Sequence, residues 1–300
     1  MTPQETGSIE IYRQRIEELH NLPTVPVIAT QLLEIISEDR ASVKQLLPII
    51  ENDPSLAIKI LRVANSAYYG LFKNIDSLQQ AVVLIGLSDL YNLVLGFSVI
   101  KSFSQHMENS YTLDWNYFWG HCVAVGSIAQ LIKTEYRLPM IGNPYALGLL
   151  HDIGKLVLFQ IVRPEFMEAL KIQEERKVSA VEAEMETIGM DHALAGALLA
   201  ERWHLPDSVI VTMSHHHKIV PEESEYRGII SLITVADYLS HRMKKGFLNH
   251  YAEATDVITD AWNRLRAHYP QLGALTLEQL EQIVIEKMPP TEELLAVTRS

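Results

Sequence analysis

Residues 115–132 read WNYFWGHCVAVGSIAQLI and contain no charged side chain. A membrane-spanning helix needs about 18 or more consecutive apolar residues. Here the polar residues Asn116, His121, Ser127 and Gln130 interrupt the apolar run. We therefore expect a helix that is buried on all sides inside a protein that does not enter a membrane, with a histidine among its few polar side chains.

The segments outward from this helix repeat the helical pattern. Upstream, the four aliphatic side chains of residues 46–50 lie at the i, i+3, i+4 spacing of one helix face. Alternating patterns typical of strands are nearly missing. Signals for helix N-termini recur at Asp53-Pro54, at Ser77 with Gln80, and at Thr276 with Gln279. The sequence therefore predicts an all-α protein.

A polar stretch, HMENSYTLD at residues 106–114, separates two strongly apolar parts of the chain. Polar clusters between periodic segments are typical of loops. We therefore divide the chain into an N-terminal helical lobe (1–110), a second helical core (111–245) and a C-terminal helical extension (246–300).

Composition and charge exclude several classes of function. With 300 residues, 48% of them hydrophobic, the chain can bury a large core and is not globally disordered. The formal net charge of −12 repels nucleic acids and anionic membrane surfaces. The one cysteine, Cys122, forms no internal disulfide, and the first ten residues contain no apolar signal core. Both features indicate a cytoplasmic protein.

The string LLHDIGK, residues 149–155, carries the sharpest chemical signal. His151 and Asp152 offer one nitrogen and one oxygen donor to a shared point, which a borderline divalent metal accepts. Lys155 follows one turn later and could hold a substrate phosphate as a point charge. A single His-Asp pair is weak evidence, so further ligands are needed.

Further ligand-type residues follow in apolar surroundings, and each has an ordinary alternative. His121 could be a hydrogen-bonded core histidine, and His192 a first-turn helix residue. Asp237 could cap a neighbouring helix, although a buried carboxylate is costly without a partner. The triple His215-His216-His217 ends an apolar segment, and the remaining histidines are expected to be surface or packing residues. The charged segment 171–186 is interpreted as a solvated helix face.

Several strings together resemble the HDOD module, a bacterial signalling output domain of the HD phosphohydrolase superfamily. They are NLPTVPVIATQLLEII, IENDPSLAIKILRVANSAYYG, IDSLQQAVVLIGLSDLYNLVL, HDIGK, ERWHLPDSV and SHHHKIVP. The resemblance covers about residues 20–240. It implies an N-terminal HDOD helical lobe packed against an HD-type helical core.

The resemblance also implies two divalent metals, with one carboxylate shared between them as a bridge. One metal would take His121, His151, Asp152 and Asp237, and the other Asp152, His192, His216 and His217. The triple leaves the register open, with His215 as the alternative to His216 or His217. Nitrogen-rich ligands of this kind favour iron or manganese, with zinc as an alternative, over magnesium or calcium.

Two functions follow from the resemblance. HDOD modules usually lack several of these ligands and act as non-catalytic signalling modules, whereas this chain has the full set. The first function is a signal-transduction output protein that retains the dinuclear site and engages other signalling proteins. The second is a metal-dependent phosphohydrolase or phosphodiesterase acting on a phosphorylated, nucleotide-like small molecule, with Asp152 and Lys155 as catalytic residues. The chain lacks the GYP segment that accompanies cyclic di-GMP hydrolysis in related proteins.

Overall fold

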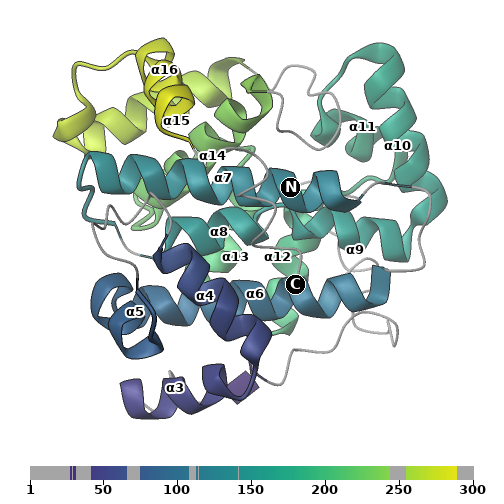
Figure 1. Ribbon diagram of the computed structural model, residues 1–300. Coiled ribbons are helices and arrows are strands. Elements are labelled where there is room, and N and C mark those ends of the chain that lie inside the picture. Colours follow the sequence, from purple (N-terminus) through teal and green to yellow (C-terminus); the bar gives the residue numbers. More distant parts are fainter. Residues whose placement is uncertain are drawn as a thin grey trace.

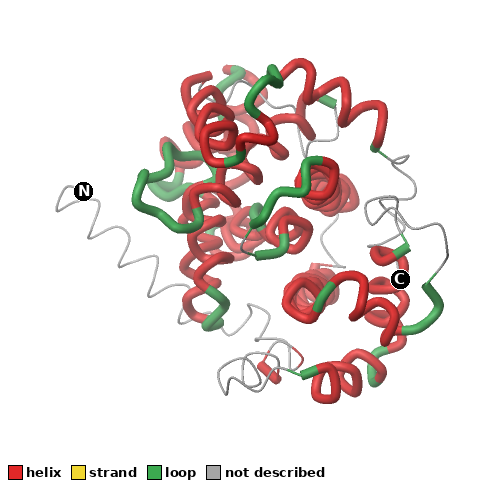
Figure 2. Tube along the Cα trace, turned by 90° about the vertical axis from the view of Figure 1, so that its left-hand side faces the viewer, coloured by secondary structure: helices red, strands yellow, loops and turns green. Residues whose placement is uncertain are grey.

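The computed structural model describes residues 28, 30–31, 42–65, 75–107, 113, 115–140, 142–243 and 255–288. Helices account for all regular structure in these residues, and no strand occurs among them (Figures 1 and 2). The N-terminal part contains α3 (Val43–Glu51), α4 (Pro54–Ala64), α5 (Leu78–Ile85) and α6 (Leu87–Met107). The core contains α7 (Trp115–Glu135), α8 (Pro144–Leu150), α9 (Ile153–Ile161), α10 (Arg163–Arg176), α11 (Ala180–Thr187), α12 (His192–Arg202), α13 (Asp207–His215) and α14 (Arg227–Arg242). The C-terminal part contains α15 (Thr255–His268), the short 3₁₀ helix η2 (Pro270–Leu272) and α16 (Leu277–Lys287). The all-α prediction is confirmed.

Local sequence signals set the helix ends as expected. The side chains of Asp53 and Ser77 each accept a hydrogen bond from the backbone N–H three residues later, at the starts of α4 and α5. Thr276 and Gln279 form a reciprocal capping box at the start of α16. These bonds satisfy N–H groups that the first helical turn leaves without intrahelical partners.

The predicted central helix, α7, is buried along most of its length. It packs against α8 and α14, and Figure 1 shows α8 between α7 and α6. Gly126 of α7 and Gly148 of α8 touch so closely that a β-carbon on either would collide with the backbone of the facing helix. This contact holds the C-terminal end of α8 beside the middle of α7.

A second glycine contact joins α9 to α12. A β-carbon on Gly154 would collide with the carbonyl oxygen of His192 and lie 2.6 Å from the backbone nitrogen of Gly196. Such close backbone approach is available only to glycine. The start of α9 is therefore fixed against the start of α12.

The N-terminal part shares one hydrophobic core with the rest of the described chain. Helix α6 packs on α8, where the ring centroids of Phe97 and Tyr145 lie 6.4 Å apart. The amide side chain of Asn65 bonds both the N–H and the carbonyl oxygen of Ile75, at 2.6 and 2.7 Å. Residues 66–70 of the ANSAYYG string and most of NLPTVPVIATQLLEII lie outside the described residues. The division at residues 110 and 245 stays a prediction.

The C-terminal helices cover α14 and α7. Arg242 at the end of α14 forms two hydrogen bonds with Glu281, both 3.1 Å long, and Lys287 contacts Glu135 of α7 at 2.6 Å. No single helix in the described ranges is long and apolar enough to cross a membrane, although the bent pair of residues 78–85 and 89–103 reaches that length and composition together.

Candidate metal centre

The predicted ligands come from five separate places in the core. His121 lies in the middle of α7, and His151 and Asp152 lie in the turn between α8 and α9. His192 is the first residue of α12, His216 and His217 follow the last residue of α13, and Asp237 lies in α14. The two glycine contacts described above hold three of these places together, because they join α7 to α8 and α9 to α12.

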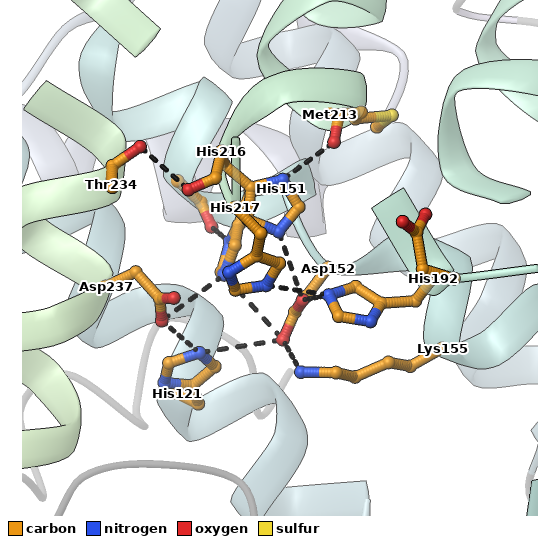
Figure 3. Close-up of polar contacts among 12 residues, drawn as sticks. His121, His151, Asp152, Lys155, His192, Met213, His216, His217, Thr234 and Asp237 are labelled. Carbon is orange, nitrogen blue, oxygen red and sulfur yellow. Dashed lines mark hydrogen bonds and ion pairs between the residues drawn. The ribbon is translucent and has the colours of Figure 1, made fainter. Parts of the chain in front are cut away.

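The structure brings these seven side chains into two adjacent groups (Figure 3). The three-residue group consists of His121, His151 and Asp237, and the four-residue group consists of Asp152, His192, His216 and His217. Within each group, the candidate ligand atoms lie within 4.8 Å of one another. All seven residues are buried except His217, which is partly exposed.

Asp152 lies between the two groups. Its Oδ1 atom lies 3.1 Å from Nε2 of His192 and 3.7 Å from Nε2 of His216. Its Oδ2 atom lies 3.6 Å from Nε2 of His121 and 3.7 Å from Nε2 of His151. One oxygen therefore faces each group, as a bridging carboxylate requires.

Four of the five histidines are held through Nδ1, which leaves Nε2 facing the centre. The Nδ1 atoms of His151 and His216 bond the carbonyl oxygens of Gly148 and Met213, both at 2.7 Å. His121 bonds the hydroxyl of Ser240 at 3.2 Å, and His192 bonds the carboxylate of Glu184 at 2.7 Å. Metal-bound histidines in proteins show this arrangement, because the outer bond fixes the tautomer and the ring orientation.

The inward-facing atoms lack ordinary hydrogen bonds. Nε2 of His121, His151 and His216 and Oδ1 of Asp152 and Asp237 are buried and form no hydrogen bond of acceptable geometry among the described residues. A buried polar atom without a hydrogen bond costs about 1–3 kcal/mol, and the closest approach among these five is 3.0 Å, between Nε2 of His121 and Oδ1 of Asp237. A cation bound between them removes this cost, so the residues present fit a metal site.

The ionisation of the centre suits a cation as well. Burial favours the neutral carboxyl of Asp152, but Lys155 and His151 outweigh it and hold its pKa well below the usual range. Burial likewise opposes charge on His192, yet Glu184 and Asp152 raise its pKa to about 9. Burial, with His216 and His192 nearby, lowers the pKa of His217 well below its usual value. In the absence of metal, a proton on His192 therefore supplies positive charge to the four-residue group.

Lys155 contacts the shared carboxylate directly. Its Nζ atom donates to Oδ2 of Asp152 at 2.6 Å, and its side chain is only 10% exposed. Figure 3 shows the lysine reaching Asp152 from the side of His192. Its ammonium group is thus positioned at the centre and could contact either the carboxylate or an anion bound beside it.

The structure separates His215 from its two neighbours. Nδ1 of His215 lies 3.1 Å from the carbonyl oxygen of Val211 and 2.6 Å from the hydroxyl of Ser214. The four-residue group contains His216 and His217 instead. The geometry therefore favours the register in which His216 and His217 are the ligand candidates.

Sequence reasoning missed two residues beside the centre. The segment 171–186 is not simply a solvated face, because Glu184 is buried and bonds both the backbone N–H and the ring of His192. His241, expected among surface or packing residues, lies with Nε2 3.4 Å from Oδ1 of Asp237 and its ring 4.6 Å from that of His121. Helical spacing of four residues from Asp237 could have indicated His241. No local pattern connects Glu184 to His192, eight residues away.

The helices and the buried histidine–aspartate cluster define an all-α protein with a buried candidate metal centre. A family model for the HDOD domain matches residues 22–219, and the chain belongs to this family. The match ends before α14, which carries Asp237.

One relative and two solved structures are similar to this chain. An uncharacterized protein from Treponema pallidum is 27% identical over 237 residues, and the match covers 78% of this chain and 45% of that protein. An HDOD domain protein of unknown function from Geobacter sulfurreducens shares the fold with a TM-score of 0.73 at 23% identity, covering 98% of both chains. A proposed phosphohydrolase from Shewanella amazonensis has a TM-score of 0.66 at 21% identity, covering 97% of this chain and 98% of that one. The chain thus spans less than half of the Treponema pallidum protein.

Proposed function

We propose that this chain is an HDOD-type signal-transduction output protein that retains a dinuclear metal site. The observation that carries the proposal is the pair of ligand groups around Asp152, with one carboxylate oxygen facing each group. Five inward-facing atoms without hydrogen bonds give the cluster a physical reason to bind cations. The signalling role rests on membership of the HDOD family.

The donor set favours iron or manganese, with zinc as the alternative. Five imidazole nitrogens and two carboxylates are available, whereas magnesium and calcium prefer oxygen donors throughout. His121, His151 and Asp237 would hold one ion, and His192, His216 and His217 the other, with Asp152 shared between them. Metals bound there would supply water activation and charge neutralisation for displacement at phosphorus.

The N-terminal helices are the proposed contact surface for signalling partners. Val83 of α5 is 87% exposed, and Ile58 of α4 is 47% exposed. Large exposed apolar side chains are typical of surfaces that bind other proteins when they occur together. The partners would be other signalling proteins.

The second candidate function is hydrolysis of a phosphorylated small molecule, and the position of Lys155 favours it. The side chain of Lys155 is 10% exposed and His217 is partly exposed, and an anion would have to approach the metals past these two residues. Lys155 would then leave Asp152 and neutralise a phosphate oxygen. Asp152 would keep its place between the two ligand groups.

Elemental analysis of protein purified without a metal-affinity tag tests the proposal. About two equivalents of iron, manganese or zinc per chain support the site, and less than half an equivalent overturns it. A screen of phosphodiester and phosphomonoester substrates with added manganese or iron then separates the two functions. Hydrolysis that disappears in Asp152→Asn supports the enzyme, whereas metal binding without turnover supports the signalling role alone.

A further inference from the structure

The two ligand groups differ in what lies behind their histidines. His121, His151 and His216 bond neutral acceptors through Nδ1, namely one hydroxyl and two backbone carbonyl oxygens. His192 alone among these four bonds a carboxylate, that of Glu184. Among these four histidines, the one with a charged outer partner therefore belongs to the four-residue group.

Glu184 is fixed in place by more than one contact. It lies in α11, whose buried residues are Ala183 and Glu184, and its side chain is 2% exposed. Oε2 accepts from the backbone N–H of His192 at 2.8 Å and from Nδ1 of the same residue at 2.7 Å. One oxygen thus holds both the start of α12 and the imidazole ring.

This contact determines which nitrogen of His192 can bind a cation. Nδ1 must carry a proton to donate to the carboxylate, so Nε2 is the atom that can accept a metal. Nε2 lies 3.1 Å from Oδ1 of Asp152 and 2.9 Å from Nε2 of His217, among the other ligand atoms of its group (Figure 3). A carboxylate behind an imidazole also strengthens the ring as a donor.

We infer that Glu184 is a positioning residue that orients His192 and strengthens metal binding at the four-residue group but not at the three-residue group. The inference rests on the proposed dinuclear site. It assigns a role to a residue that contacts no ligand atom facing the centre, and it makes the two metal positions unequal. Removal of such outer partners typically costs 10- to 100-fold in metal affinity.

The test measures zinc affinity of each group separately by competition with a chromophoric chelator. In a His121→Ala background the four-residue group is measured, and in a His217→Ala background the three-residue group. We expect Glu184→Ala to weaken zinc binding at least about tenfold in the first background and less than about threefold in the second. No loss in the first background, or equal loss in both, overturns the inference.

Glu184→Gln and Glu186→Ala complete the design. Glutamine keeps an oxygen that can accept from Nδ1 but removes the charge, so its loss should be smaller than that of alanine, and it carries the test if Glu184→Ala does not fold. Glu186 lies on the same helix, is exposed and pairs with Arg176 at 2.8 Å, so Glu186→Ala should leave zinc binding at both groups unchanged.

Nitrogen-15 NMR of labelled histidine measures the tautomer of His192, which would not change if Glu184 had a purely structural role. In zinc-loaded wild type and Glu184→Gln, His192 should carry its proton on Nδ1, and Glu184→Ala should lose this fixed signature. A wild-type protein that binds no zinc refutes the metal site itself. A wild type that binds two zinc ions while Glu184→Ala behaves identically refutes only the role of Glu184.

Discussion

The three-residue and four-residue groups use the same kinds of ligand atom but have different surroundings. Around His121, His151 and Asp237, the nearby outer groups are Ser240, a backbone carbonyl and His241. Around the four-residue group they include the charged side chain of Glu184, whereas Lys155 donates to Oδ2 of Asp152, the oxygen that faces the three-residue group. Because both groups consist of imidazole and carboxylate ligands, differences between them in metal affinity and pH response should come from these outer residues.

Asp152→Asn should have the largest effect, because it removes what the two groups share. The amide cannot present an anionic oxygen to each group, and Lys155 loses its counter-ion. We expect bound metal to fall from about two equivalents to less than half an equivalent, measured by elemental analysis. Breaking a buried ion pair also costs about 3–5 kcal/mol when one charge is left uncompensated.

Asp191→Asn is the matched control for this substitution. Asp191 is also a buried acid beside His192, but it caps α12 by accepting from the backbone N–H of Leu194 at 2.7 Å. Asparagine caps helices about as well as aspartate. This variant should keep both metals, and Asp152→Asn retaining two equivalents would contradict the shared role of Asp152.

Gly154→Ala should have the second largest effect, and it should weaken metal binding much more at one group than at the other. The added methyl group would force α9 from α12, and therefore Asp152 from His192. We expect a loss of about 3 kcal/mol in the free energy of unfolding, measured by urea denaturation. Metal affinity should fall more at the four-residue group than at the three-residue group.

Gly96→Ala provides the comparison, since Gly96 also lies within a helix at a packed contact. There the atoms nearest to a β-carbon belong to Leu149 and Ala146 and lie 3.5–3.8 Å away, which is ordinary van der Waals distance. Alanine also favours helix more than glycine does. Gly96→Ala should therefore be neutral or stabilising, and equal destabilisation by both substitutions would contradict the tight contact at Gly154.

Sequence reasoning found the parts of the centre that have a local signature. The helical periodicity, the HDIGK string and buried polar residues such as Asp237 pointed to helices and to ligand candidates, and the structure brings all seven candidates together. Glu184 was missed because its contact with His192 depends on the turn between α11 and α12, which no spacing rule encodes. The glycine pairs were missed for the same reason, since only the packed helices show which backbones touch.

The stability of metal-free protein should depend on pH through His192, which belongs to the four-residue group. His192 has a pKa of about 9 in the folded protein, above the value of about 6.5 expected when unfolded. Its protonation therefore stabilises the fold fully below pH 6.5, and this stabilisation is lost as the pH rises through 9. The loss should be on the order of 3 kcal/mol or less, measured by urea denaturation of chelator-treated protein between pH 6.5 and 9.

Glu184→Gln should flatten this decline, because the carboxylate that raises the pKa of His192 is gone. Metal-loaded protein should behave in the opposite way, since metal binds neutral imidazole and competes with the proton. Its stability should rise over the same pH range. A decline of equal size in Glu184→Gln would contradict the assignment of this pH response to the four-residue group.

His241→Gln should have the smallest effect and should affect only the three-residue group. Nε2 of His241 lies 3.4 Å from Oδ1 of Asp237, a longer contact than the 2.7 Å bond between Glu184 and His192. Zinc affinity of the three-residue group, measured in the His217→Ala background, should therefore fall by less than about tenfold. His215→Gln is the control beside the other group, and it should leave both affinities unchanged because His215 bonds Val211 and Ser214 instead. A loss of more than about a hundredfold in His241→Gln would instead make His241 a ligand, and the three-residue group would then hold its metal with four protein side chains of its own.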